Sequence, residues 1–318
     1  MNRRQFLAQG AAAVAGAAVL GVARAEEQHV TSKPAVLPII DTHQHLWDLS
    51  KFKLPWVKKG TLLARSFLMA DYKKATAGLN VVKTVYMEVD VDPAQQQQEA
   101  DYVLGVCKKG DTPMAAAVIS GRPASDGFAK YITPFKGSRF IKGVRQVLHG
   151  QGTPAGYCLA KSFIRGVRLL GELGLSFDLC VRPGELADAA RLVDACPDTR
   201  FILDHCGNAN VQVRDRSVWK RAMAALARRK NIVCKVSGIV ASAKPGKWTA
   251  DDLAPIVKHT VTVFGHDRVM FGGDWPVCTL AATYKQWVEA LRAIVHDWKE
   301  EERRKLFHGN AQRFYGLA

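Results

Sequence analysis

The chain has 318 residues, of which 45 are Lys or Arg and 29 are Asp or Glu, giving a formal charge of +16 at pH 7. So basic a chain can attract anionic molecules, but it holds no Lys/Arg tract interleaved with aromatic residues, which argues against a nucleic-acid-binding protein. Its seven cysteines have no tight spacing. They therefore indicate buried thiols rather than a disulfide framework or a zinc–thiolate site.

The first 25 residues are expected to be a removable export signal. They begin MNRRQFL, continue with the weakly apolar AQGAAAVAGAAVLGVARA, and carry small residues at Ala23 and Ala25. Arg3 and Arg4 resemble the twin-arginine signal of bacteria, and the apolar stretch is too short and too rich in Gly and Ala for a membrane anchor. This predicts cleavage after Ala25 and a periplasmic or secreted protein without a stable membrane anchor. Cleavage removes three arginines and lowers the formal charge to +13.

The rest of the chain alternates short apolar runs with amphipathic stretches. Most of the runs are nearly continuous in apolar residues, as expected for parallel strands covered on both faces. Eight strands are predicted, at 36–41, 82–89, 114–120, 139–147, 175–181, 200–206, 231–237 and 268–274.

Helical stretches separate these strands. Pro93 and Pro183 stand where a helix would begin, and Thr249 is a candidate N-cap followed by acidic residues. The alternation predicts an α/β protein, a single (β/α)8 TIM barrel over residues 36–318. The clearest predicted helices are 93–107, 183–196, 217–229, 249–264, 280–295 and 299–316.

In such a barrel, chemistry is expected at the C-terminal ends of the strands. His43 and His45 lie at the end of the first strand, and residues two apart in a strand point to the same face. Neutral imidazoles are common ligands of divalent metals. Two polar residues at a strand-to-loop junction are an equally good reading of this pair alone.

Other strand ends also carry reactive side chains. Asp274 is the strongest candidate for function, against a turn or helix-cap aspartate. His205 is either a ligand or a core histidine, and its neighbours Asp204 and Cys206 are expected to face the other way, Asp204 in a structural role behind the barrel wall. The remaining strand-end candidates are Glu88, Asp90, Arg145, Lys235, Ser237 and Trp275, with the less specific His149 in a loop.

Arg145 and Lys235 are the cationic candidates. Arginine binds carboxylates and oxyanions in bidentate geometry, but Arg145 could instead form a salt bridge with Glu88 or Asp274. Lys235 could bind an anion or pair with a neighbouring carboxylate, and Glu88 could be a ligand, a substrate contact or that partner.

Taken together, these motifs resemble the amidohydrolase superfamily, and within it the amidohydrolase-2 branch of TIM-barrel metal-dependent hydrolases, which includes sugar lactonases. The motifs that carry the resemblance are IIDTHQHLWD, GVRQVLHG, FDLCVRPGEL, FILDHCGNAN, VCKVSGI, RVMFGGDWPV and HGNAQRFYGL, which span nearly the whole mature chain in order.

The resemblance implies one divalent metal ion, zinc as the first choice, bound by His43, His45, His205 and Asp274. The next strand, 232–239, has no histidine, so a two-metal site is not expected. Some lactonases of this group resemble that pattern and work without a metal, so the resemblance leaves the metal dispensable.

The hypothesis is a lactonase that opens a sugar or carboxylated lactone, with a small anionic molecule or a sugar lactone as its partner. Its catalytic residues are Asp274, His205 and Arg145, where Asp274 assists attack by water. Its expected substrate contacts are Arg145, Glu88, Lys235 and Trp275. The alternatives are a metal-dependent decarboxylase of the same branch and an exported binding protein without catalysis.

Overall fold

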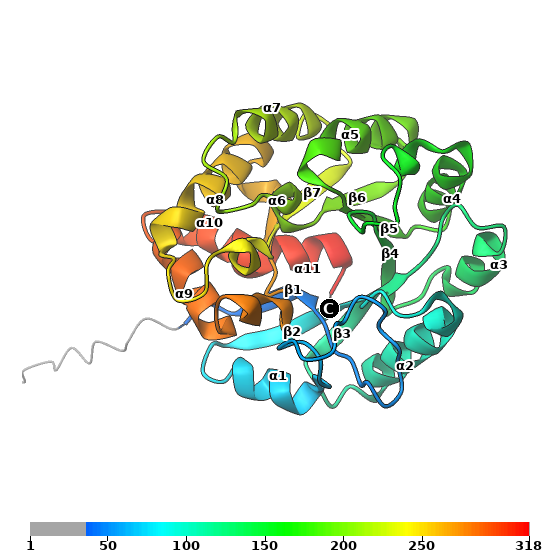
Figure 1. Ribbon diagram of the computed structural model, residues 1–318, viewed down its shortest axis with the longest axis horizontal. Helices are drawn as coiled ribbons and strands as arrows, with labels where there is room; N and C mark the ends of the chain where they lie inside the picture. Colours follow the sequence, from blue (N-terminus) through cyan, green and yellow to red (C-terminus); the bar gives the residue numbers. More distant parts are fainter. Residues whose placement is uncertain (1–35, 318) are drawn as a thin grey trace, which may run out of the picture. The chain divides into compact units, whose positions relative to one another are not determined.

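The computed structural model describes residues 36–317, so the expected export signal lies outside the described residues. Eight parallel strands follow one another in sequence order in one sheet (Figure 1), as predicted. The strands are β1 (Ile39–Gln44), β2 (Val81–Met87), β3 (Met114–Ser120), β4 (Ile141–Val147), β5 (Ser176–Cys180), β6 (Arg200–Leu203), β7 (Ile232–Val236) and β8 (Val269–Phe271).

The first and last strands meet, so the sheet curls into a nearly closed barrel. A parallel bridge joins Gln44 to Trp275. The backbone N–H of Asp274 donates to the carbonyl of His43 at 2.8 Å, and that of His45 donates to the carbonyl of Trp275 at 2.8 Å. This architecture agrees with the predicted TIM barrel, and the closing contacts involve the residues expected to carry the chemistry.

Helices surround the strands as an outer ring (Figure 1). Thr249 and Asp252 form a reciprocal capping box at the start of α8, which confirms the predicted N-cap. Pro93 opens a single 3₁₀ turn that leads into α2. The helices are α1 (Met69–Ala75), α2 (Gln96–Lys109), α3 (Phe128–Ile132), α4 (Lys161–Glu172), α5 (Leu186–Ala195), α6 (His205–Asn208), α7 (Ser217–Leu226), α8 (Ala250–Phe264), α9 (Tyr284–Ile294), α10 (Glu300–Arg304) and α11 (Asn310–Tyr315).

The C-terminal helix α11 covers the end of the barrel where the strands begin. Asn310 donates to the carbonyl of Val269 at 2.7 Å, at the start of β8. Arg200, the first residue of β6, donates to the carbonyl of Phe314 at 2.8 Å. Because α11 covers this end, only the opposite end, where the strands finish, is open to a ligand.

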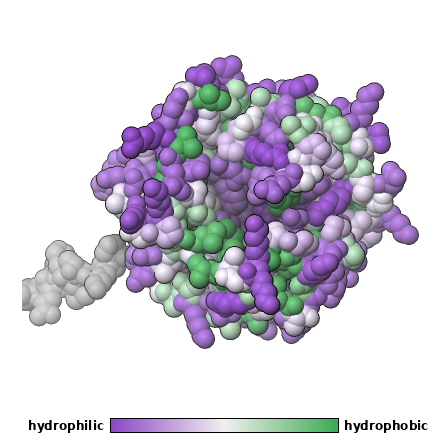
Figure 2. Space-filling view, in the orientation of Figure 1, coloured by the Kyte–Doolittle hydropathy of each residue, from purple (hydrophilic) through white to green (hydrophobic). Residues whose placement is uncertain are grey.

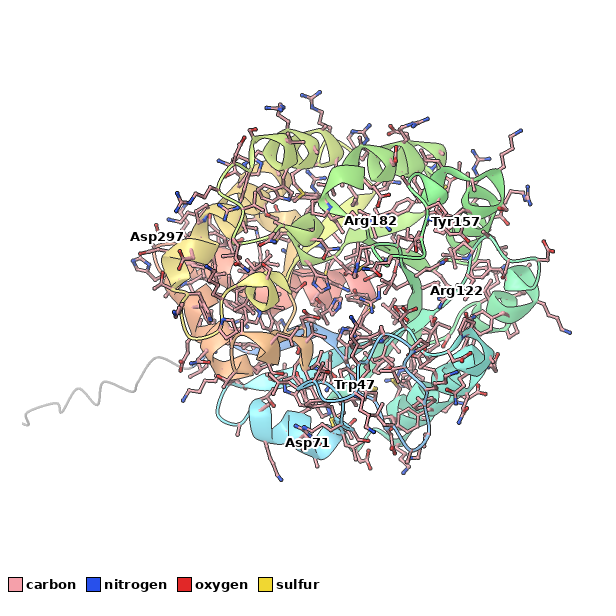
Figure 3. The ribbon with its side chains drawn as sticks, viewed as in Figure 1. Trp47, Asp71, Arg122, Tyr157, Arg182 and Asp297 are labelled. Atoms are coloured by element: carbon pink, nitrogen blue, oxygen red, sulfur yellow. The ribbon has the colours of Figure 1, made fainter. Side chains whose placement is uncertain are left out.

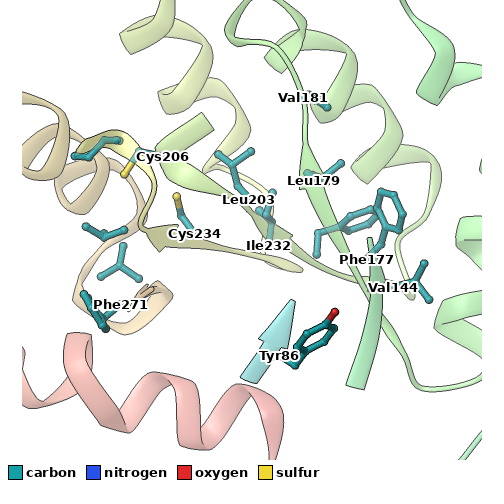
Figure 4. Close-up of a cluster of buried hydrophobic side chains, with 14 of the residues drawn as sticks. Tyr86, Val144, Phe177, Leu179, Val181, Leu203, Cys206, Ile232, Cys234 and Phe271 are labelled. Carbon is teal, nitrogen blue, oxygen red and sulfur yellow. The ribbon is translucent and has the colours of Figure 1, made fainter. Parts of the chain in front are cut away.

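Most of the core lies between the strands and the surrounding helices. Phe177, Leu179, Leu203 and Ile232 are fully buried there (Figure 4). A smaller cluster inside the barrel joins residues of β1, β2, β3 and β8 to α11. All seven cysteines fall within the described residues and are buried, unpaired thiols, as the sequence predicts.

β6 and β8 each end three residues before their predicted ends. β6 ends at Leu203 and β8 at Phe271, because the backbone turns left-handed at His205 (φ 53°) and at Asp274 (φ 52°). Both expected functional residues therefore stand just past their strands, on sharp turns. None of the helices between residues 36 and 317 is long and apolar enough to cross a membrane.

Candidate active site

Three imidazoles and one carboxylate converge where β1, β6 and β8 end. Oδ1 of Asp274 lies 3.7 Å from Nε2 of His43, 3.4 Å from Nε2 of His45 and 4.0 Å from Nε2 of His205. All four residues are buried or nearly so. The structure therefore brings together the four residues that the sequence singled out as ligands.

Asp41 ties the ends of β1 and β8 together behind this cluster. Its Oδ1 accepts from the backbone N–H groups of His43 (3.0 Å) and Gly273 (2.7 Å). Its Oδ2 accepts from the hydroxyls of Tyr72 (2.8 Å) and Tyr284 (3.0 Å). Burial raises the pKa of Asp41, and these four hydrogen bonds oppose that rise. Sequence reasoning missed this residue, although it lies within the same motif as the two histidines.

Two of the imidazoles are oriented through Nδ1. Nδ1 of His45 lies 2.9 Å from the carbonyl of Met87, which can only accept, so Nδ1 carries a proton. Nδ1 of His205 lies 2.9 Å from the hydroxyl of Ser237. Burial lowers the pKa of His205, although the carboxylate of Asp274 opposes this. These contacts turn Nε2 toward the centre of the site, as a hydrogen bond at the other ring nitrogen does for metal-binding histidines.

His43 lies deepest and has charged neighbours at both nitrogens. Its Nδ1 lies 3.5 Å from Oδ1 of Asp204 and 3.5 Å from Nζ of Lys235. Its Nε2 lies 3.3 Å from a terminal nitrogen of Arg145. Burial lowers the pKa of His43 well below its usual value, and Asp204 only partly opposes this. The ring is therefore neutral and able to bind through Nε2.

The structure corrects the predicted position of Asp204. This residue faces into the barrel, 3.2 Å from Nζ of Lys235 and 3.5 Å from a terminal nitrogen of Arg145. The prediction assumed strict alternation along β6, but the strand ends at Leu203 and the left-handed turn at His205 breaks the alternation. Asp204 and His205 thus both belong to the site region.

Lys235 sits in a chain of buried charges beneath the site. Its Nζ lies 2.5 Å from Oδ2 of Asp178, and it is fully buried. Burial alone would lower the pKa of Lys235, but the carboxylates of Asp178 and Asp204 raise it above its usual value. Lys235 therefore remains charged, and the carboxylates of Asp178 and Asp204 balance its charge.

Arg145 pairs with Glu88, one of the partners the sequence left open. Its Nε donates to Oε1 of Glu88 at 2.6 Å, and a terminal nitrogen donates to the Glu88 carbonyl at 2.7 Å. Trp275 packs edge-on against Phe67 and Tyr72, with ring centroids 5.5 Å apart in each case. Lys235 and Trp275 are buried away from the cavity, as is Glu88, so only Arg145 of the four expected substrate contacts lines it.

A cavity of about 440 Å³ opens above the site. Figure 2 shows a hollow near the middle of this face of the molecule, with hydrophobic side chains beside it. His45, Arg145, His205 and Asp274 lie along the cavity. The sequence did not identify several other lining residues, because they lie in loops and short helical turns whose course it does not show; they include Trp56, Asn208, Ile239 and Val277.

The donor set fits a divalent cation. Ligand atoms of His43, His45 and Asp274 all lie within 4.8 Å of one another, as do those of His43, Asp204 and His205. Imidazole nitrogens with a carboxylate oxygen are typical zinc ligands. The guanidinium of Arg145 would compete with such a cation for Nε2 of His43, because it already lies within hydrogen-bonding distance of that nitrogen.

The family model for amidohydrolases matches residues 40–317, nearly all of the described chain. The chain belongs to this amidohydrolase family. This confirms the family that the sequence motifs resemble. The amidohydrolase is 28% identical over 297 residues to L-fucono-1,5-lactonase from Burkholderia multivorans, covering 87% of this chain and 96% of that relative. It is 22% identical over 333 residues to L-rhamnono-gamma-lactonase from Scheffersomyces stipitis, covering 88% and 98%.

Solved structures share the fold of this amidohydrolase. A crystal structure of an amidohydrolase from Burkholderia multivorans with bound zinc has a TM-score of 0.79 and 25% identity, covering 88% of this chain and all of the other. The structure of a 2,6-dihydroxybenzoate decarboxylase has a TM-score of 0.61 and 14% identity, covering 88% and 100%. The second likeness shows a common fold and nothing more.

Proposed function

We propose that this amidohydrolase is a lactonase. The observation that carries the proposal is the convergence of Asp274 on the Nε2 atoms of His43, His45 and His205 beside a cavity of about 440 Å³. One carboxylate faces several neutral imidazoles there, which suits proton transfer next to a polarised carbonyl. The lactonase names of the two relatives support the same reaction.

Asp274 is proposed to act as general base and then as general acid. It removes a proton from water as the water oxygen bonds to the lactone carbonyl carbon. When the ring C–O bond breaks, Asp274 returns that proton to the departing alkoxide, and a hydroxy acid is released. Arg145, which lines the cavity, stabilises the negative charge that develops on the carbonyl oxygen; His205 either holds the metal ion or, without one, donates a hydrogen bond to that oxygen.

We propose that His43, His45, His205 and Asp274 hold one divalent metal ion, zinc as the first choice. Such an ion would polarise the lactone carbonyl as a Lewis acid. The donor set and the zinc in the Burkholderia multivorans amidohydrolase support this. Metal analysis of the purified protein, with turnover measured before and after chelation, tests it. Full turnover by metal-free protein would exclude a catalytic ion while leaving lactone hydrolysis intact.

The reaction class is tested by supplying two kinds of substrate to the purified protein. Ring opening of five- and six-membered sugar lactones is followed by acid release, and loss of CO2 is followed with carboxylated phenols. The proposal predicts acid release and no CO2. CO2 evolution without lactone opening would assign the protein to the decarboxylases, and silence on both panels would favour a binding protein.

We further propose that the protein acts outside the cytoplasm after removal of its first 25 residues. The twin arginines Arg3 and Arg4 and the small residues at Ala23 and Ala25 support this. N-terminal sequencing of protein recovered from the bacterial periplasm is expected to begin at Glu26. Full-length protein confined to the cytoplasm would contradict it.

A further inference from the structure

The cavity above the site has mainly apolar walls. Its apolar side chains come from loops or strand ends after five different strands, so they surround the ligand position rather than cover one side of it. The residues that matter most here are Trp56, Val89, Val147, Ile239, Ala241 and Val277. Walls of this kind favour an apolar group on the ligand, since burial of apolar surface is favourable.

Asn208 and Ser242, two polar residues of the same wall, already have hydrogen-bond partners. The amide nitrogen of Asn208 donates to the carbonyl of Val181 at 2.7 Å. The hydroxyl of Ser242 donates to the carbonyl of Ile239 at 2.7 Å and accepts from the backbone N–H of Val211 at 3.0 Å. The wall therefore offers few unused polar groups to ligand hydroxyls.

Only one Lys or Arg, Arg145, is among the described residues that line the cavity. Two of its nitrogens donate to Glu88, and the third lies 3.5 Å from Oδ2 of Asp204. Two carboxyl groups, Asp90 and Asp274, also line the cavity. Away from the proposed metal position, a carboxylate on the ligand would thus find no cation that lacks an acidic partner, and it would lie in a cavity that already holds two acidic side chains.

Two arginines that follow strands of the barrel are also engaged. Arg122 and Arg182, which follow β3 and β5, are labelled in Figure 3. Arg122 donates to the carboxylate of Asp90 at 3.0 Å. Arg182 pairs with Glu185 at 2.9 Å and donates to the carbonyl of Gly150 at 2.6 Å. Neither guanidinium is available to a ligand without breaking these contacts.

We propose that the lactone taken by this site is uncharged and carries an apolar substituent that packs against the wall around Trp56, Val147 and Ile239. Lactones that bear a carboxylate are poor substrates, although the chain as a whole is strongly basic. The inference rests on the proposed lactonase function and restricts its substrate class. Its physical cause is the cost of placing a carboxylate among apolar groups without a partner.

The test compares kcat/KM for three γ-butyrolactones that differ only at the γ-carbon, which carries a methyl, a pentyl or a carboxylate group. The methyl compound should be opened about 100-fold more efficiently than the carboxylate compound, as expected for an unpaired buried charge. The pentyl compound should exceed the methyl compound by about 10-fold or more.

The inference is overturned if the carboxylate compound is opened within tenfold of the methyl compound, or if the pentyl compound is no better than the methyl one. Those results would leave lactone hydrolysis itself established. If none of the three compounds nor any lactone of the wider panel is opened, the proposed function fails, and the substrate inference fails with it.

Two variants place a new cation in the wall. Val147→Arg and Ala241→Arg each add a guanidinium to the cavity wall that can pair with a ligand carboxylate, so the carboxylate-to-methyl ratio of kcat/KM should rise by about 10-fold or more in at least one folded variant. Val218→Arg, on the exposed surface of α7, is the matched control and should leave the ratio unchanged. An unchanged ratio in both folded wall variants would count against the proposal.

Discussion

The buried charges beneath the site are compensated within the protein, and Lys235 is the central member. It lies between the carboxylates of Asp178 and Asp204, and all three side chains are fully buried. Removing one partner of such a network leaves charge in the interior without compensation. This network explains why a lysine expected to touch substrate has a structural position instead.

Lys235→Met is therefore expected to lower the free energy of unfolding by about 3–5 kcal/mol. The matched control is Lys285→Met. Lys285 pairs with Glu289 at 3.8 Å on the exposed surface of α9, where such a pair contributes less than about 1 kcal/mol. Urea unfolding of the two variants measures the difference. Equal losses in the free energy of unfolding would show that the buried charges around Lys235 do not stabilise the protein more than a surface ion pair does.

Glu99 gives the protein a pH-dependent stability. It is fully buried in α2, and it accepts from the hydroxyl of Tyr86 at 2.9 Å and from the N–H of Val89 at 2.8 Å. Burial raises its pKa from 4.5 to about 8. Because the folded-state pKa is raised, the stability contributed by its proton is fully present below pH 4.5 and is lost as the pH rises through 8.

Glu99→Gln keeps the shape of the side chain and removes this titration. The free energy of unfolding of the variant minus that of the unmodified protein should be larger at pH 9 than at pH 5 by more than about 1 kcal/mol. Urea unfolding at both pH values measures it. A difference that stays constant over this range would show that Glu99 does not titrate in the folded protein.

Among the elements, the two helices α2 and α4 contain glycines for different reasons. A methyl group at Gly166 in α4 would lie 2.1 Å from the carbonyl oxygen of Pro123, so the helix needs glycine to approach that loop. A methyl group at Gly105 in α2 would meet nothing within 4 Å.

The same Gly→Ala substitution should therefore have opposite effects in the two helices. Gly105→Ala is expected to stabilise the protein by about 0.5–1 kcal/mol, because alanine loses less backbone entropy in a helix. Gly166→Ala is expected to destabilise it by about 1–3 kcal/mol through overpacking. Thermal and urea unfolding measure both, and a stabilising Gly166→Ala would contradict the close approach between α4 and Pro123.

The strands were predictable from sequence because most are nearly continuous apolar runs. Their C-terminal ends were less so. At β6 and β8 the predicted strands extend three residues past the last paired residue, whereas the backbone turns left-handed at His205 and Asp274. The positions of His205 and Asp274 at strand ends thus predicted that both lie at the site, but strict alternation put Asp204 on the wrong side of the wall. Trp56 could not be assigned to the cavity because it lies in the long loop between β1 and α1.

On the scale of the whole molecule, the strongly positive net charge of the chain is not matched by the charged residues that line the cavity. The chain carries +16, which by itself predicts an anionic partner. The cavity nevertheless presents two carboxyl groups and one guanidinium that is already paired. The overall basic character therefore describes the surface, and the substrate class must be inferred from the residues that line the cavity.

Asp274 is proposed to transfer protons at the point where three imidazoles meet. This role is tested most directly by kcat for lactone opening in Asp274→Asn and in Asp267→Asn, a surface control in which the replaced carboxylate pairs with Lys305. If Asp274 is the general base, kcat should fall by about 10²–10⁴-fold in Asp274→Asn and by no more than about 3-fold in the control. A folded Asp274→Asn protein with turnover close to that of the control would contradict this role.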